Sequence, residues 1–163
     1  MTPRFVRAAL AFAALAALGC QTAYNNAYNE QYDKLKQENA QQQAMDAAAH
    51  AEAQKYAAVI YFATGSAELD ADGQQQLRWF AGKMTPYPQA TFAVQGFADS
   101  TGTELTNQML SAQRAQACAS YLTSLGIAPA RMQVTAFSSS SPAASNTTVG
   151  GRKNNRRVEI TVL

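Results

Sequence analysis

The stretch "GFADSTGTELTNQMLSAQRA", residues 96–115, joins the two kinds of secondary structure that this chain combines. It opens at the end of "TFAVQGFA", residues 91–98, an apolar run of strand length. Apolar residues then recur at helical spacing from about Ser111 to Leu125, and Gly126 follows in the position of a left-handed helix cap. The stretch therefore predicts a strand, a polar turn and a helix.

The flanking segments extend this alternation from about Tyr56 to the end of the sequence. The apolar run "YAAVIYFA", residues 56–63, predicts a strand. A helical face follows and ends before two prolines; its residues and the prolines are Leu77, Phe80, Ala81, Met84, Pro86 and Pro88. "RMQVTAFS", residues 131–138, predicts a third strand, and "SSSPAASNTTVGG", residues 139–151, predicts a loop.

The last segment, "RRVEITVL" at residues 156–163, places Val158, Ile160 and Val162 on one face, which predicts a half-buried strand. The predicted order is thus strand, helix, strand, helix, strand, loop, strand. Helices that alternate with strands imply some parallel pairing, so the expected class is α/β (α+β) with a two-layer sandwich. The segment from residue 57 to residue 163 has a normal size for one domain.

The first twenty residues have the pattern of an export signal. Arg4 and Arg7 precede an apolar run of eleven residues, 8–18, whereas a helix that spans a bilayer needs about 20. A charged start, a short apolar run and small residues before a cleavage site predict a signal peptide over residues 1–19. The ending "AALGC" resembles the lipobox of bacterial lipoproteins, which implies lipidation of Cys20. An ordinary secretion signal with a chance cysteine is the alternative.

The residue after that cysteine bears on the destination of the chain. Retention of such lipoproteins in the inner membrane favours Asp at this position, and the chain has Gln21, so the resemblance implies an outer-membrane anchor with the domain in the periplasm. Each buried acyl CH₂ would stabilise the anchor by about 0.8 kcal/mol. The second cysteine, Cys118, then has no disulfide partner, and its apolar helical face predicts a buried structural thiol.

Residues 20–56 predict a helix-prone tether behind the lipidated cysteine. Ala, Gln and Asn dominate this segment, which has no Pro or Gly and few large apolar residues, so it cannot bury a core of its own. Tyr24, Tyr28 and Tyr32 recur every four residues, but the apolar repeat fades before the three or four heptads that a coiled coil needs. Weak self-association through the tyrosines is an open alternative.

From residue 57 to residue 163 the sequence resembles the OmpA-like peptidoglycan-binding domain of peptidoglycan-associated lipoproteins (Pal). Three segments carry the resemblance: "YFATGSAEL", "GFADSTGTELTNQMLSAQRAQACASYLTSLGI" and "NTTVGGRKNNRRVEI". The second is the most specific, because it keeps Gly96, Asp99, Asn107, Arg114 and Gly126 at the family's spacing. The resemblance implies a mixed four-stranded sheet with helices packed on one face.

The resemblance also implies a ligand and two residues that hold it. The family binds peptidoglycan without a covalent bond, through the diaminopimelate of the stem peptides, and so ties the outer membrane to the cell wall. The far end of diaminopimelate carries an ammonium and a carboxylate on one carbon. Asp99 can accept from the ammonium, and Arg114 can fork onto the carboxylate. Ser111 as the helix N-cap would place Arg114 in the first turn, where backbone N–H groups also favour an anion.

We expect further contacts or loop braces from four residues: Asn107, Thr101, Ser111 and Arg152. Phe97 and Ala98 stand where the family often has His and Thr, which removes two side-chain hydrogen bonds near the site. From the residues alone, an equal alternative is that Asp99 and Arg114 form a structural salt bridge, which at an exposed position is worth at most about 1 kcal/mol.

Other functional classes find little support in the residues. The segment from Tyr56 onward contains no histidine, no paired carboxylates for acid–base work and no zinc ligand set, so we expect neither an enzyme nor a metal or cofactor. The net charge of +2 and the export signal argue against nucleic acid, despite the basic run at residues 152–157. The remaining alternative is an envelope protein-interaction or regulatory module. Pal-like proteins also bind a partner of the Tol system, and no residue pattern here identifies such a partner.

Overall fold

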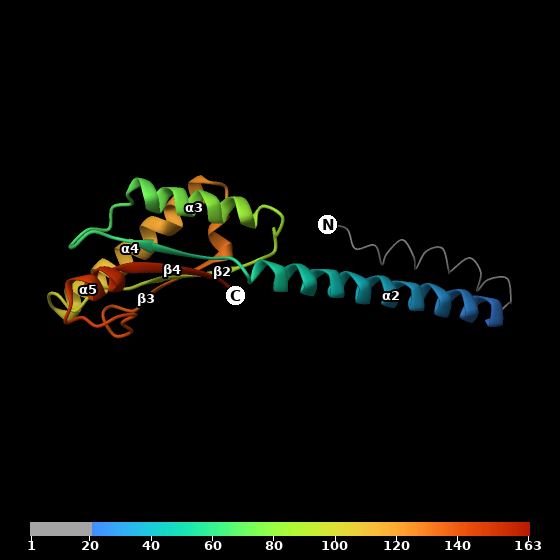
Figure 1. Cartoon of the computed structure of the whole chain (residues 1–163). Coiled ribbons are helices and arrows are strands. Elements are labelled where there is room, and N and C mark those ends of the chain that lie inside the picture. The colour runs from blue at the N-terminus through green and yellow to red at the C-terminus, as the bar shows by residue number, and fades with distance from the viewer. Residues whose placement is uncertain (1–20) are drawn as a thin grey trace. The chain divides into compact units, whose positions relative to one another are not determined.

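The structure is a computed structural model that describes residues 21–163 (Figure 1). The chain divides after Ala48 into two compact units. Helix α2 (Gln21–Ala53) has 33 residues, as the helix-prone composition predicts. The tyrosines of the predicted stripe stack along it, with ring centroids 6.4 Å apart for Tyr24 and Tyr28 and again for Tyr28 and Tyr32. No helix among the described residues is long and apolar enough to cross a membrane.

The second unit, Ala49–Leu163, holds a mixed four-stranded sheet. Its elements are β1 (Ala57–Tyr61), α3 (Ala71–Met84), β2 (Phe92–Gly96), α4 (Glu104–Ser124), η1 (Pro129–Arg131), β3 (Met132–Ala136), α5 (Val149–Asn155) and β4 (Arg157–Val162). The strand order is β1-β4-β2-β3. The last strand, β4, runs antiparallel between β1 and β2, while β3 pairs with β2 in parallel. The predicted class, strand order along the chain and mixed sheet are confirmed.

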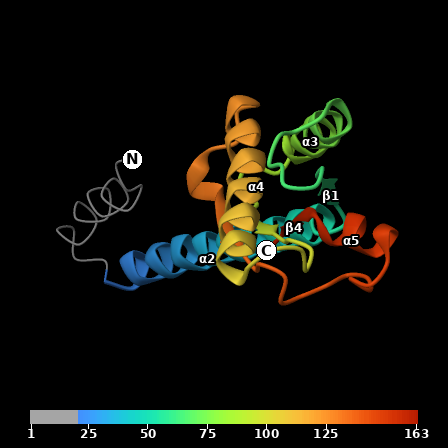
Figure 2. The same ribbon diagram turned by 90° about the vertical axis from the view of Figure 1, so that its left-hand side faces the viewer.

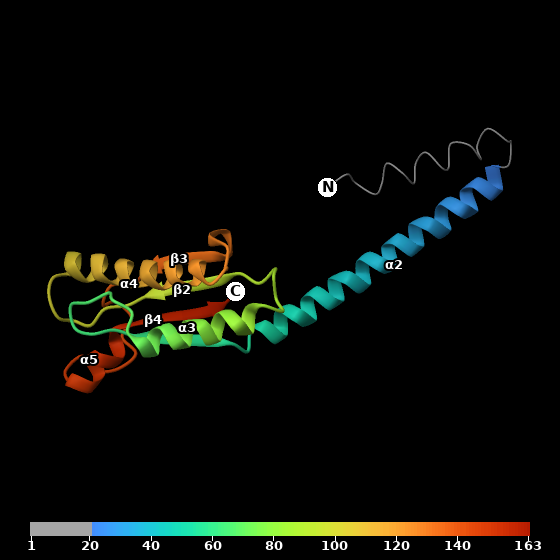
Figure 3. The same ribbon diagram turned by 90° about the horizontal axis from the view of Figure 1, so that it is seen from above.

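Helices α3 and α4 lie on the same side of the sheet (Figures 1 and 2). Helix α3 packs against β1, and α4 packs against β2 and β3 (Figure 3). The apolar alternation of the strands explains this arrangement, since Ile60, Val158 and Ile160 point into one layer and are at most 1% exposed. This confirms the predicted one-sided packing.

The apolar core fills the space between the sheet and these two helices. From α3 it takes Leu77, Phe80 and Met84, three residues of the predicted helical face. The Phe80 ring meets the Phe92 ring edge to face at 5.4 Å. Cys118 of α4 is fully buried here, and burial raises its pKa to about 12, so the predicted structural thiol stays protonated at neutral pH.

The start of α4 was predicted wrongly. The helix begins at Glu104, and its N-cap is Thr103, whose Oγ1 accepts from the Thr106 amide at 3.2 Å, so Ser111 is not the cap. The reason is the direction of the first apolar side chains. Leu105 and Met109 face solvent with exposures of 72% and 56%, so no inward apolar repeat marks the first turns.

The segment predicted as a loop at residues 139–151 also needs a correction, because α5 begins inside it. Thr148 caps this short helix by accepting from the Gly151 amide at 2.9 Å. Two glycines weaken the helical signal in the sequence. Gly151 is required by close packing, since a Cβ there would lie 1.8 Å from the Ser145 carbonyl oxygen. The predicted cap at Gly126 is confirmed by its φ of +94°.

Candidate functional site

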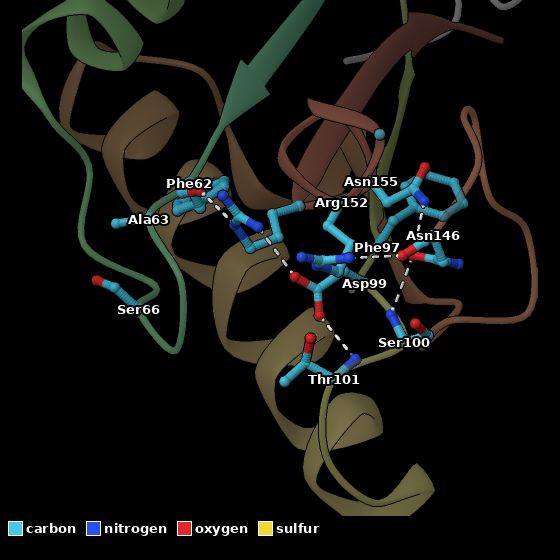
Figure 4. Close-up of polar contacts among 12 residues, drawn as sticks. Phe62, Ala63, Ser66, Phe97, Asp99, Ser100, Thr101, Asn146, Arg152 and Asn155 are labelled. Atoms are coloured by element: carbon cyan, nitrogen blue, oxygen red, sulfur yellow. Dashed lines mark hydrogen bonds and ion pairs between the residues drawn. The ribbon is translucent and has the colours of Figure 1, made fainter. Parts of the chain in front are cut away.

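Asp99 lies in the turn that follows β2, at one end of the sheet (Figure 4). The residue is 4% exposed. Its Oδ1 accepts from the Thr101 amide at 2.8 Å, and its Oδ2 accepts from Arg156 Nη1 at 2.9 Å. Burial by itself would raise the pKa of Asp99, but the Thr101 amide and the Arg156 guanidinium outweigh burial and hold that pKa below its ordinary value. The site therefore contains a buried carboxylate that is ionised at neutral pH.

Gly96 lets this turn lie close to α4. A Cβ on Gly96 would lie 2.0 Å from the carbonyl oxygen of Ser111 and 3.1 Å from the Ala115 Cβ, so a side chain there would push β2 away from the helix. The close contact brings the end of β2 against the middle of α4. Arg114, in the third turn of that helix, can therefore reach the same end of the sheet.

The Arg114 side chain is fully buried and binds three backbone carbonyls. Its Nε donates to Ser66 at 2.8 Å, its Nη1 to Phe97 at 3.1 Å and its Nη2 to Ala63 at 3.1 Å. The guanidinium thus fastens the loop between β1 and α3 to the end of β2. Three of its five N–H donors are used in this way.

The pKa of Arg114 is lowered to about 10, first by burial and then by the nearby Arg156 cation, while Asp99 acts in the opposite direction. Arg114 is therefore still charged at neutral pH. Arg114 bonds the carbonyl of Ala63, and Arg156 bonds both the adjacent Phe62 carbonyl and Asp99, so the three charged groups lie at the same end of the sheet.

Asp99 and Arg114 are brought to the same end of the sheet, but they do not pair with each other. Within residues 21–163, the ion pair of Asp99 is with Arg156, and the hydrogen bonds of Arg114 go to carbonyls. The alternative of a simple Asp99–Arg114 salt bridge is therefore not the arrangement that the structure has. Arg156 also donates from Nε to the Phe62 carbonyl at 3.1 Å, so it links the end of β1 to the Asp99 turn.

Arg156 was absent from the residues predicted for the site. It directly precedes β4. Because β4 lies antiparallel between β1 and β2, the first two residues of β4 pair with the last residues of these neighbours. The register pairs Tyr61 with Arg157 and Gly96 with Val158. The sequence signal was the first arginine of "NNRRVEI", but placing it at the site requires the order of the strands in the sheet, which the sequence pattern leaves open.

The remaining predicted residues lie around this centre. Thr101 contributes its backbone amide to Asp99. Asn107 is 3% exposed on the inward face of α4. Ser111 is fully buried inside the helix, where its Oγ donates to the Gln108 carbonyl at 3.0 Å and accepts from the Ser138 amide at 3.1 Å. Ser111 therefore braces the loop after β3. Cys20, the predicted lipidation site, lies outside the described residues.

Arg152 reaches the Asp99 turn through an asparagine. Its Nη1 donates to the Asn146 carbonyl at 2.9 Å, and Asn146 Oδ1 accepts from the Ser100 amide at 3.1 Å and from Asn155 Nδ2 at 2.8 Å (Figure 4). Asn155 is fully buried, and its amide also bonds both backbone groups of Ala144. The loop before α5 is thus fixed against the turn that carries Asp99.

The two departures from the family pattern lie behind the turn. Phe97 and Ala98 are 5% and 3% exposed. The Phe97 ring stacks on the Phe137 ring with their centroids 5.3 Å apart. The Arg157 guanidinium lies over the face of the Phe97 ring, 3.9 Å from the centroid of that ring. Apolar and cation–π contacts therefore replace the polar ones at these positions, and the Asp99 carboxylate keeps its two hydrogen bonds.

Fold and site together define a small α+β binding module, with a buried carboxylate and several guanidinium groups at one end of a mixed sheet. Among residues 21–163, no three His, Cys, Asp or Glu side chains are grouped as they would be to hold a metal ion. The chain belongs to the OmpA family, whose model matches residues 61–156, more than half of the sequence.

Individual relatives show the same relationship. The chain is 40% identical over 103 residues to the peptidoglycan-binding protein ArfA of Mycobacterium tuberculosis, covering 63% of this chain and 32% of that protein. It is 36% identical over 104 residues to the peptidoglycan-associated lipoprotein of Agrobacterium fabrum, covering 64% of this chain and 58% of that protein. The matched part of the chain thus spans about a third of the length of the first relative and somewhat less than three fifths of the second.

Among solved structures, the peptidoglycan-associated lipoprotein of Burkholderia pseudomallei superimposes with a TM-score of 0.63 at 26% identity, covering 65% of this chain and 90% of that one. The resemblance to the OmpA-like domain of Pal, first based on three sequence segments, is confirmed by the family match and by this shared fold.

Proposed function

We propose that the domain binds peptidoglycan without a covalent bond and holds the diaminopimelate of a stem peptide at the Asp99 site. The observation that carries the proposal is a buried, ionised carboxylate beside two guanidinium groups, those of Arg114 and Arg156. A zwitterion with both charges on one carbon needs an anion and a cation within a few ångströms of each other. The family of the chain, and relatives named for binding or association with peptidoglycan, support the same ligand.

In this proposal Asp99 accepts from the ligand's ammonium. Its two oxygens offer about four lone pairs, and the Thr101 amide and Arg156 use two of them. The carboxylate of the ligand lies toward the guanidinium groups, where charge-assisted hydrogen bonds are shorter and stronger than neutral ones. Asn107, Ser111 and Arg152 serve as contacts or as braces of the loops around the site. No step of this binding requires a metal or a cofactor.

We further propose that the chain is a lipoprotein of the outer membrane, anchored through Cys20, with this domain in the periplasm. The support is the signal-like sequence of residues 1–19, the lipobox-like ending and the naming of a relative as a lipoprotein. Helix α2, about 50 Å long at roughly 1.5 Å per residue, would serve as the spacer between lipid and wall. Cys20→Ser should remove the protein from outer-membrane fractions and abolish incorporation of labelled palmitate.

The experiment that tests wall binding is co-sedimentation of the chain beginning at Gln21 with purified peptidoglycan sacculi. We expect the protein in the pellet, and we expect a soluble peptide containing diaminopimelate to release it. The control is Arg78→Gln, which removes one positive charge from an arginine that donates to the Tyr121 hydroxyl, outside the Asp99 site. Protein that stays in the supernatant, or pellets equally in the presence of the peptide, would contradict the proposal. Capture of an envelope protein under those conditions would favour the protein-interaction alternative.

A further inference from the structure

A long part of the sequence is almost free of charge. Within residues 115–151, Arg131 is the only charged residue, in a chain that has 13 Lys and Arg and 11 Asp and Glu. Arg131 is also turned inward, since its guanidinium donates to the Ala90 carbonyl at 2.8 Å and to the Tyr87 carbonyl at 2.7 Å. The C-terminal half of α4 and the whole of β3 are thus built from uncharged residues. Interfaces between proteins show the same depletion of charge at their centres.

The strand in this segment, β3, forms one edge of the sheet. The order β1-β4-β2-β3 leaves it paired on one side only, with β2. In a parallel pair, the backbone groups of alternate residues bond the neighbouring strand. The Phe137 amide donates to the Gly96 carbonyl at 2.9 Å, so the backbone N–H and C=O groups of Val134 and Ala136 are directed to the outer side. Edge strands are commonly guarded by charge, proline or a bulge, and β3 has none of these.

A groove of about 430 Å³ lies beside this edge, between α4 and β3. Helix α4 contributes Ala119, Ser120 and Thr123 to its lining, and β3 contributes Met132 and Val134. Val134 is 42% exposed although it lies on the side of the sheet that the helices cover, because no strand follows β3. The groove therefore has room for small, uncharged side chains of a strand that approaches the outer side of β3.

We infer that β3 pairs with β3 of a second copy of this chain, antiparallel and centred on Val134, so that the two four-stranded sheets join. A second copy has the chemistry that the edge and the groove require, since its β3 is an uncharged strand with Met132, Val134 and Ala136 on the groove side. A two-fold axis at Val134 places Met132 opposite Ala136 of the second copy, and the two Val134 residues exchange N–H···O bonds. Like charges do not meet across this axis, because the strand carries no charge.

The symmetry of this pairing has a consequence for the molecule. The axis is perpendicular to the sheet, so the helices of both copies cover the same side and the two grooves face each other. Because the paired strands run in opposite directions, the two Asp99 sites lie at opposite ends of the joined sheet. On the proposed function, which the pairing itself does not require, such a dimer holds two stem peptides at once and so binds the wall more firmly than one copy.

Sedimentation equilibrium of the chain beginning at Gln21, without peptidoglycan, tests the pairing. We expect a reversible monomer–dimer equilibrium between about 10 µM and 1 mM, because the interface is small. Val134→Lys should weaken dimerisation at least about tenfold, since two like charges would face each other across the axis. The fold should tolerate this change, because lysine is common on edge strands. The matched control is Val59→Lys on β1, the opposite edge, where a valine that is 39% exposed should be replaceable without effect on the dimer.

A mixture of variants with opposite charge tests the arrangement of the two strands. Val134→Glu by itself should be as monomeric as Val134→Lys, and an equimolar mixture of the two should restore dimers, because unlike charges then meet at the axis. Tyr32→Ala tests whether the tyrosine stripe of α2 is the contact instead, and we expect it to leave the dimer unchanged. Circular dichroism checks that each variant is folded.

The outcomes locate the contact. A wild-type chain that stays monomeric up to about 1 mM would overturn the inference. Dimerisation of a folded Val134→Lys variant at wild-type strength, or a mixture that restores no dimers, would overturn the pairing through β3. Loss of dimers in Tyr32→Ala, with none in Val134→Lys, would assign the contact to α2. These measurements contain no peptidoglycan, so failure of wall binding would overturn the proposed function and leave the pairing intact.

Discussion

The inward face of α4 has two halves with different chemistry. In the C-terminal half it presents Ala115, Cys118 and Leu122, which are buried in the apolar core. In the N-terminal half it presents Asn107, Ser111 and, at the boundary, Arg114, which are as deeply buried but polar. Burial of the apolar side chains of the C-terminal half stabilises the fold. Burial of the polar side chains of the N-terminal half costs free energy unless they are hydrogen-bonded, so this half maintains a polar site inside the fold. The structure of one helix thus separates folding from function along its length.

The largest effect should come from the residue at the boundary. Arg114→Ala removes the donors of three backbone carbonyls and leaves a cavity, so we expect a loss of about 3–5 kcal/mol in the free energy of unfolding, together with loss of wall binding. Urea unfolding and sacculus co-sedimentation measure the two effects. The matched core variant Leu122→Ala should lose about 2–5 kcal/mol and still bind when folded. Equal binding by both folded variants would contradict the division of the helix.

Asp99→Asn should separate ligand binding from folding at a residue that lies outside α4. The amide keeps the shape of the side chain and an acceptor for the Thr101 amide, but it removes the charge that an ammonium needs. We expect the affinity for the diaminopimelate peptide to fall by about 2–5 kcal/mol, because a ligand charge loses its partner. Calorimetry at neutral pH measures this, with Asp72→Asn in the first turn of α3 as the control. Retained affinity would remove Asp99 from the binding site.

The same variant should also reveal a pH dependence of stability. The pKa of Asp99 is lower in the folded chain than its ordinary value, so ionised Asp99 stabilises the fold above its unfolded pKa of about 4. This contribution is lost as the pH falls through the folded pKa. The difference in unfolding free energy between wild type and Asp99→Asn should therefore be constant from pH 7 to about pH 5 and shrink below about pH 4. A difference that stays constant down to pH 2 would contradict the lowered pKa.

The two halves of α4 also differ in what the sequence could predict. The apolar half follows a simple period, so Cys118 and Leu122 were predicted on one buried face. The polar half has no such period, because its inward residues are polar and its apolar residues, Leu105 and Met109, face solvent. The helix start was consequently placed at Ser111, seven residues too late. The short helix α5 was not predicted for a related reason. Its close packing requires Gly151, and glycine weakens the helical signal in the sequence.

The site was predictable in part. Asp99 and Arg114 were found through a family spacing, which records their function but not their contacts. The partner of Asp99 could not be found in that way. Arg156 is 57 positions away and reaches Asp99 only because β4 is inserted between β1 and β2. A pairing of this kind depends on the order of the strands, and the same local patterns are compatible with other orders.

A smaller effect is expected behind the site, where Ser138 has a left-handed backbone with φ of 51°. Its buried Oγ makes no hydrogen bond within the described residues, while its amide bonds Ser111 and its carbonyl bonds Ala98. Ser138→Gly should remove the backbone strain and the unpaired buried hydroxyl, although glycine also raises the conformational entropy of the unfolded chain. We expect a net gain of about 1 kcal/mol in the free energy of unfolding. Thermal unfolding measures the gain, and Ser141→Gly in the same loop is the control. A loss of stability would mean that the hydroxyl has a partner.

The smallest effect should come from the outer face of the same polar half. Leu105 and Met109 stand one turn apart on α4, with 72% and 56% of their surface exposed, and they contribute little apolar burial. Leu105→Gln and Met109→Gln should each change the unfolding free energy by less than about 0.5 kcal/mol, because surface substitutions away from caps and charge networks are nearly neutral. Their affinity for the diaminopimelate peptide should equal that of the wild type. Denaturation and calorimetry on the two variants measure both quantities. If either variant lost wall binding while remaining as stable as the wild type, the outer face of α4 would belong to the ligand surface, and the function of this half of the helix would extend beyond its buried residues.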